Sequence, residues 1–210
     1  MANRFTRQWL LPQLLVATCI LAGLAIFGAA KDEARAMKVG LIFEGTFESA
    51  ALAKKIEGAK RTQLVPYYEW DYGIRAFTED YWTENQFTWE RISDLSKRNA
   101  ETILDNVEPT IIRDSRGVAE YLIIEDEDPF LTCILLSDTL IDHFNEWLGA
   151  QIYAVCIDRH LIYLFPAAGS TIEDYGPALV DEFMRASLPV SLEVLLIDES
   201  GVRVFAELQR

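Results

Sequence analysis

Two kinds of hydrophobic spacing alternate along the chain after residue 37. Short apolar and β-branched runs separated by turn-forming residues are typical of strands. Three pairs of such runs enclose polar turns and predict hairpins, at 109–113 with 118–125, 152–157 with 161–165, and 192–197 with 202–206. Further strands are expected at 39–43, in the first part of 67–77 and at 130–136.

Helical spacing separates these runs. Thr78 and Thr88 are suitable N-caps for a short helix that reaches Asn85 and a longer one that ends at Asn106. The clearest helical pattern follows Ser137 and stops at a glycine, position 149. Helices are also predicted at 48–56 and 171–186. The second should begin near residue 176, because the proline at 177 suits a first helical turn.

These elements predict an α+β fold, with a mixed, mainly antiparallel sheet of about six strands and three or four packed helices. An N-terminal apolar helix is expected to precede it. The predicted organisation is a signal peptide or membrane anchor at 1–36, a lead-in segment at 37–66 that Pro66 closes, and an α+β domain at 67–210.

Residues 9–30 form an uncharged, mostly apolar run after Arg4 and Arg7. A span of about 20 apolar residues can cross a bilayer as a helix, whereas a secretory signal has an apolar core of about 7–15 residues. The run therefore predicts membrane contact through residues 9–30, as an anchor or a cleaved signal, with the domain outside the cytoplasm. The alternative is translation from Met37, which would leave a cytoplasmic protein.

The chain is acidic, with a formal net charge of −14 and a pI near 4.5. Residues 37–210 alone carry 15 basic and 31 acidic side chains. A nucleic-acid backbone selects Lys and Arg, so nucleic acid is excluded as the main partner. The hydrophobic half of the composition excludes a disordered chain.

Nine of the 24 aromatic residues lie between 67 and 89, among several acids. Aromatic faces beside carboxylates are typical of sugar binding. The candidate binding residues are Trp70, Tyr72, Trp82, Glu69 and Asp71. These two carboxylates, with Glu79 and Asp80, are also the candidates for a hydrolase. The alternative is that the rings face inward and build the core while the acids face water.

No phosphate-binding loop, dinucleotide-binding fingerprint, zinc-protease motif, nucleophile elbow or Cys-x-x-Cys pair occurs in the sequence. Cys133 and Cys156 fall in predicted apolar strands, and their spacing from His143 and His160 does not match a zinc site. We therefore predict no metal and no cofactor, with both cysteines buried and unbridged. A thiolate–imidazole pair is the alternative, although both histidines are expected at exposed element edges.

Three segments carry a resemblance to known proteins. They are residues 76–82 before the long helix, residues 120–136 around Asp128-Pro129-Phe130, and residues 152–165 around Asp158-Arg159-His160. Together they resemble the YtpQ-like family of uncharacterised bacterial proteins, over about 67–207. That family has no established activity or catalytic residues, so the resemblance implies none for this chain. Its members look cytosolic, and the apolar N-terminus of this chain departs from that pattern.

The preferred interpretation is a non-enzymatic, envelope-associated protein with a contact or scaffolding role and another protein as its partner. A hydrolase and a glycan or small-molecule binding module are the alternatives. The sequence does not decide whether the protein is an enzyme, although the absence of catalytic motifs argues against one. It also leaves the oligomeric state undecided. A pocket with convergent buried carboxylates would favour the hydrolase, and a shallow aromatic platform would favour the binding module.

Overall fold

The computed structural model describes residues 38–169 and 172–209. Residues from Met37 onward form one compact unit. The predicted apolar helix, signal peptide or anchor at 1–36 lies outside the described residues. Within the described ranges, no helix is both long and apolar enough to cross a membrane.

Helices and strands alternate along the described chain. In chain order the elements are β1 (Val39–Gly45), β2 (Lys54–Lys55), β3 (Thr62–Trp70), β4 (Gly73–Ala76), α2 (Glu79–Glu84), α3 (Trp89–Leu104), β5 (Thr110–Arg113), β6 (Ala119–Glu125), the 3₁₀ helix η1 (Leu131–Leu136), α4 (Leu140–Leu148), β7 (Ile152–Asp158), β8 (Leu161–Pro166), α5 (Ile172–Phe183), β9 (Glu193–Asp198) and β10 (Gly201–Glu207). The predicted α+β class is confirmed.

The larger sheet has six strands in the order β10-β9-β7-β8-β6-β5. Every pairing in it is antiparallel, so the sheet is not mixed. It consists of the three predicted hairpins placed side by side. The predicted sheet of about six strands is therefore present.

Each of these hairpins turns at an aspartate. The Oδ1 atoms of Asp114, Asp158 and Asp198 accept hydrogen bonds from the backbone N–H two residues further on, at 2.8, 3.0 and 2.9 Å. Such Asx turns are the physical reason why aspartate favours chain reversal. The three hairpins are thus specified by short-range chemistry.

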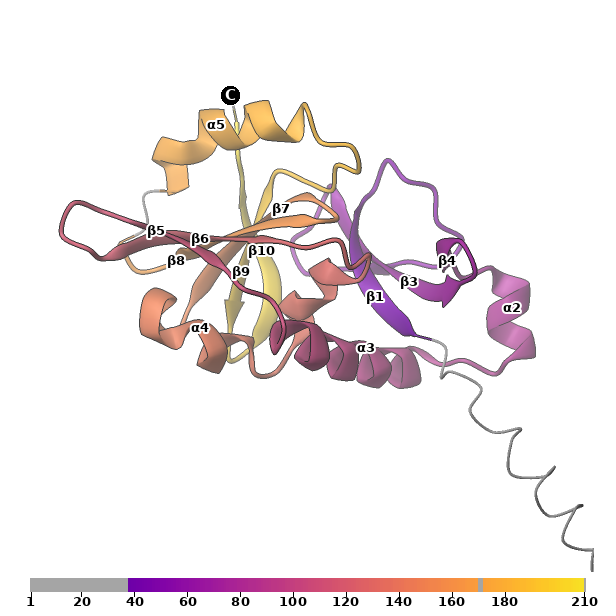
Figure 1. Cartoon of the computed structure of the whole chain (residues 1–210). Coiled ribbons are helices and arrows are strands. Elements are labelled where there is room, and N and C mark those ends of the chain that lie inside the picture. The colour runs from indigo at the N-terminus through magenta and orange to yellow at the C-terminus, as the bar shows by residue number, and fades with distance from the viewer. Residues whose placement is uncertain (1–37, 170–171, 210) are drawn as a thin grey trace, which may run out of the picture. The chain divides into compact units, whose positions relative to one another are not determined.

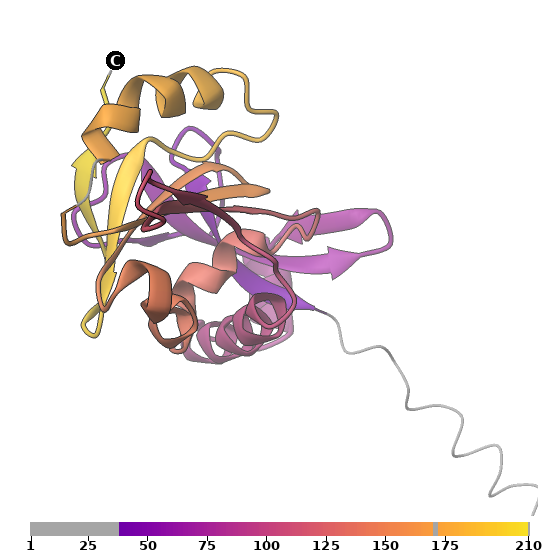
Figure 2. The same cartoon turned by 60° about the vertical axis from the view of Figure 1, so that its left-hand side comes forward.

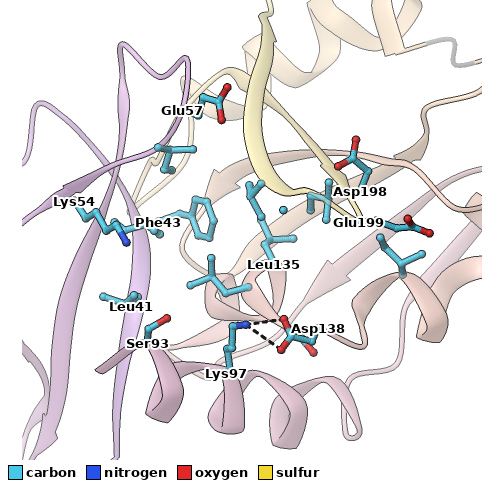
Figure 3. A pocket seen from close by; sticks show the side chains of 18 of the residues that line it. Leu41, Phe43, Lys54, Glu57, Ser93, Lys97, Leu135, Asp138, Asp198 and Glu199 are labelled. Carbon is cyan, nitrogen blue, oxygen red and sulfur yellow. Dashed lines mark hydrogen bonds and ion pairs between the residues drawn. The ribbon is translucent and has the colours of Figure 1, made fainter. Parts of the chain in front are cut away.

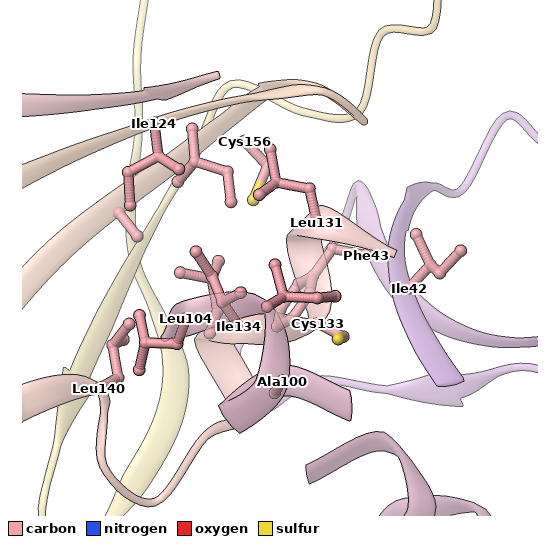
Figure 4. Close-up of a cluster of buried hydrophobic side chains, with 14 of the residues drawn as sticks. Ile42, Phe43, Ala100, Leu104, Ile124, Leu131, Cys133, Ile134, Leu140 and Cys156 are labelled. Carbon is pink, nitrogen blue, oxygen red and sulfur yellow. The ribbon is translucent and has the colours of Figure 1, made fainter. Parts of the chain in front are cut away.

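Both faces of the six-stranded sheet are covered. Figure 1 shows α5 on one face, with α3 and α4 on the other. In β7, Ala154 and Cys156 belong to the core on the α3–α4 side, whereas Val155 and Ile157 belong to the core under α5. This alternation is the period of two that a strand imposes on its side chains. Figure 4 shows the larger core, where η1 packs between the sheet and α3.

The second sheet joins β1 to β3, and β2 and β4 pair with the opposite edge of β3. Strand β3 runs across Pro66, the expected end of the lead-in segment. Residues of β1 such as Ile42 and Phe43 are fully buried in the larger core. The segment predicted as a lead-in at 37–66 is therefore a part of the domain.

The outer edge of β1 is closed by side chains instead of another strand. Ser96 Oγ accepts a hydrogen bond from Leu41 N at 2.9 Å, and Thr132 Oγ1 accepts one from Phe43 N at 3.1 Å. Asn99 donates its side-chain N–H to the carbonyl of Val39. An open strand edge exposes unpaired backbone groups, and α3 and η1 satisfy them here.

Three sequence predictions are wrong. The strand expected at 130–136 is η1, because a run that is apolar except for Thr132 has no clear periodicity that separates a buried strand from a buried helix. The helix expected at 48–56 is absent: this segment forms bends, irregular stretches and β2. Helix α5 begins four residues earlier than Gly176 and accommodates Pro177 in its interior.

Candidate functional site

The described surface contains a groove of about 580 Å³. It lies between the smaller sheet and the β9–β10 hairpin, with α3 and the η1–α4 connection along one end (Figure 3). This volume is in the range of about 300–1,000 Å³ that ligand sites occupy.

The floor of the groove is apolar. Leu41 and Phe43 of β1, Leu64 of β3 and Leu135 of η1 line it, and all four are core residues with little exposure. Ile141 of α4 adds a partly buried side chain. The floor is therefore rigid, because the residues that form it also hold the two sheets together.

The walls of the groove carry opposite charges. Lys54 comes from the β2 side, and Asp198 and Glu199 come from the facing β9–β10 turn (Figure 3). The complete set of charged lining residues is Lys54, Lys55, Lys97, Glu57, Asp138, Asp142, Asp198 and Glu199. The groove thus has three lysines and five carboxylates around an apolar floor.

Some of these charges are already engaged. Lys97 Nζ donates to both carboxylate oxygens of Asp138, at 2.7 and 2.9 Å. Neither Lys54 nor Lys55 forms an ion pair within the described part of the chain. Their charges are therefore available to a ligand.

Asp198 holds the acidic wall in place. Its carboxylate accepts hydrogen bonds from the Arg203 guanidinium at 2.6 and 3.0 Å and from Ser200 Oγ at 2.5 Å. These bonds, that of Arg203 first, lower the pKa of Asp198 well below its ordinary value. The turn that presents Glu199 is therefore fixed at neutral pH.

Comparisons with known proteins do not assign the chain to a family. No family model matches it, and comparison with curated proteins and with solved structures gives no significant match. The resemblance to the YtpQ-like family stays a prediction from the residues named above. The geometry of the domain is therefore the basis for inferring its function.

The predicted binding residues occupy two different environments. Trp70 and Tyr72 lie at the end of the β3–β4 hairpin, with Asp71 between them, and their rings meet edge-on at 5.4 Å. Trp82 lies on α2 and packs against Phe77 at 5.5 Å between ring centroids. Only the first pair is at an exposed hairpin end.

The remaining aromatic residues of 67–89 build a local core. Phe77 is buried, and the rings of Tyr68, Tyr81, Trp82 and Phe87 surround it at 4.9–5.7 Å. This arrangement matches the alternative of inward-facing rings for most of the cluster. A sugar platform is not favoured at Trp70 either, because the Arg75 guanidinium stacks on that ring at 3.6 Å and covers one face.

None of the candidate hydrolase carboxylates, which are Glu69, Asp71, Glu79 and Asp80, is buried. Glu79 and Asp80 are exposed in the first turn of α2. The buried glutamates, Glu44 and Glu193, do not line the groove. Glu193 Oε1 accepts a hydrogen bond from the backbone N–H of Lys60 at 2.8 Å, which is a structural contact.

Glu44 is held by an arginine from the β7–β8 turn. The distance from Arg159 Nε to Glu44 Oε1 is 2.5 Å, and Arg159 Nη2 donates to the Tyr67 hydroxyl at 3.1 Å. Burial raises the pKa of Glu44 above its ordinary value of 4.5, although the Arg159 charge opposes this shift. The pair connects the two sheets, and the Arg159 guanidinium occupies the Glu44 carboxylate.

The cysteines and histidines do not meet. Cys133 and Cys156 are free and buried, as predicted, but Cys133 lies in η1 and not in a strand. Burial raises the pKa of Cys133 to about 12 and also raises that of Cys156, so neither is a thiolate at neutral pH. His143 is exposed on α4, and His160 Nδ1 lies 2.9 Å from the Asp126 carbonyl oxygen. Among the described residues, no cluster of metal-ligating side chains occurs.

Sequence reasoning missed the groove. Its lining comes from both sheets, α3, η1 and α4, and no stretch of the sequence places these segments together. The only local signals were the Lys54-Lys55 pair and the acidic turn that begins at Asp198.

Proposed function

We propose that this protein is a non-enzymatic contact domain of the cell envelope, attached to a membrane through residues 9–30, and that its groove binds a segment of another protein. The observation that supports the proposal is the combination of an apolar floor with walls of opposite charge. Grooves of this kind suit peptides, whose apolar side chains enter the floor while flanking charges set their orientation.

The charge of the groove defines the chemistry of the partner. With Lys97 paired to Asp138, the remaining lysines are Lys54 and Lys55, on one wall. Asp142 and Glu199 lie on the facing side, and neither forms an ion pair within residues 38–169 and 172–209. The partner segment should therefore combine apolar residues with both charge signs and be more basic than acidic.

Site-specific photo-crosslinking tests this part of the proposal. A photoreactive residue replaces Ala150, an exposed residue of the groove, in cells that express the full chain. A matched photoreactive residue replaces Val118, which is exposed on the β5–β6 turn away from the groove. We expect a discrete protein adduct from position 150 and none of the same mass from position 118.

Charge reversal sharpens the test. Lys54→Glu with Lys55→Glu should abolish the adduct, because the basic wall is lost. Arg98→Glu with Arg185→Glu reverses two exposed charges outside the groove and should leave the adduct unchanged. An adduct that survives the lysine reversals, or that forms equally from position 118, would contradict a groove-bound partner.

Membrane attachment needs its own experiment. The full chain should float with membranes and resist alkaline extraction, and a variant without residues 9–30 should not. N-terminal sequencing of the membrane-bound protein should recover residues from before position 9. Recovery of a chain that begins near Met37 would favour cleavage or the shorter start instead.

A further inference from the structure

The end of the β3–β4 hairpin exposes two aromatic side chains. Tyr72 is 86% exposed and Trp70 is 38% exposed, whereas the other aromatic residues between 67 and 89 are buried or half-buried. Lone exposed apolar residues are common on protein surfaces. Trp70 and Tyr72 differ from such residues in their position near the start of the domain and in the residues around them.

The hairpin end lies beside the point where the chain enters the domain. Val39 is paired with Tyr68, and Glu69 N donates a hydrogen bond to the carbonyl of Lys38 at 2.8 Å. Within the described part of the chain, Trp70 is therefore one residue beyond the last backbone hydrogen bond with the start of the domain. Figure 1 shows β4 at the end of the molecule where β1 begins, with the β5–β6 loop at the other end.

The length of chain before Lys38 limits the distance to the apolar run. Residues 31–37 separate Lys38 from the run at 9–30. Seven residues span at most about 25 Å even when fully extended, at roughly 3.3–3.6 Å each. If residues 9–30 cross a bilayer, the hairpin end is tethered close to its surface.

The chemistry of the hairpin end suits the lipid headgroup layer. Trp and Tyr are enriched at membrane–water interfaces because their rings are apolar and their N–H and O–H groups are polar. Arg75, whose guanidinium stacks on Trp70 at 3.6 Å, adds a positive charge that can meet a lipid phosphate. The excess of acidic over basic side chains in residues 37–210 opposes binding to an anionic surface and favours zwitterionic lipids.

We propose that the β3–β4 hairpin end is a second membrane contact, in which Trp70 and Tyr72 enter the headgroup layer of a zwitterionic bilayer beside the N-terminal tether. This inference rests on the membrane attachment proposed above. The contact orients the domain, because two points near one end hold that end against the bilayer. The β5–β6 hairpin then points away from the membrane (Figure 2 gives the second view of the domain).

Fluorescent labels on the full chain test the proposal. In a Cys19→Ser background, Tyr72→Cys and, as a matched control, Val118→Cys are labelled with a nitrobenzoxadiazole dye; Cys133 and Cys156 are buried and should not react. Both proteins are reconstituted in phosphatidylcholine vesicles, with or without lipids that carry a nitroxide quencher near the headgroup. We expect a blue-shifted, strongly quenched label at position 72 and an unshifted, weakly quenched label at position 118.

The outcomes separate this inference from the attachment itself. Co-flotation of the protein with equal quenching at both positions would overturn the hairpin contact and leave the anchor intact. Failure to float would overturn both. A label at 72 that is shielded in native membranes but not in pure lipid would assign the hairpin to a protein partner. Much stronger quenching in vesicles enriched in phosphatidylglycerol would overturn the zwitterionic assignment.

Discussion

Arg159–Glu44 and Lys97–Asp138 are the same kind of interaction in two different settings. Glu44 and Arg159 have side-chain exposures of 1% and 17%, and they join the smaller sheet to the β7–β8 turn. Lys97 and Asp138 have exposures of 40% and 70%, and they line the groove. Strand β1 connects the two settings, since it carries Glu44 and also provides part of the groove floor.

The difference in burial decides what each pair does. Removing one partner of a buried pair leaves an uncompensated charge, which destabilises a protein by about 3–5 kcal/mol. An exposed pair contributes only about 0–1 kcal/mol, because water and salt screen it. The first pair is therefore a part of the fold, and the charges of the second can rearrange around a ligand.

Arg159→Met should produce the largest effect. It leaves the buried Glu44 carboxylate without its partner and should lower the free energy of unfolding at pH 7 by about 3–5 kcal/mol. Urea unfolding of the full-length chain in mild detergent measures this change from the midpoint and slope. A loss below about 1 kcal/mol would show that the buried Arg159–Glu44 pair contributes no more to stability than an exposed pair does.

The same variant should respond to pH in a defined direction. The pKa of Glu44 is already raised by burial, and Arg159 opposes that shift, so its removal should raise the pKa further. A raised folded-state pKa gives stability that is fully present below the ordinary value of 4.5 and lost as pH rises through the folded-state value. The difference in the free energy of unfolding between wild type and Arg159→Met should therefore become smaller as the pH falls from 7 to 5. Glu44→Gln with Arg159→Met is the control and should show no such narrowing.

Ser96→Ala tests whether the Ser96 side chain satisfies the edge of β1, and a serine of the groove lining serves for comparison. It removes the acceptor for the buried Leu41 N–H and should cost about 1–3 kcal/mol. Ser93 is three residues earlier on α3 and lines the groove, so Ser93→Ala is a matched control that should stay within about 0.5 kcal/mol. Equal losses in the same unfolding experiment would mean that the edge is not closed by Ser96.

Lys97→Met should have the smallest effect on stability. It removes the exposed pair with Asp138 and should change the free energy of unfolding by no more than about 1 kcal/mol. A large loss would show that the groove charges are structural, and the proposed binding role would lose its basis.

Several parts of the fold could be predicted from short stretches of sequence. The three hairpins follow from apolar runs around aspartate turns, and α2 and α3 begin where Thr78 and Thr88 accept hydrogen bonds from the N–H groups three residues on. Most of the aromatic cluster could also be assigned to the core by alternation. These features depend on neighbours within a few residues, which the sequence displays directly.

Only the tertiary structure decided the rest. The run at 131–136 is a 3₁₀ helix that packs between the sheet and α3, and periodicity does not distinguish a strand from a helix in a short buried segment that is almost entirely apolar. The pairing of Glu44 with Arg159 and the assembly of the groove join residues far apart in the chain. Composition and local pattern thus determined most of the element types, the acidity and the apolar N-terminal run. The site depends on which surfaces the folded elements bury together, and burial is a property of the packed chain that no short window of sequence contains.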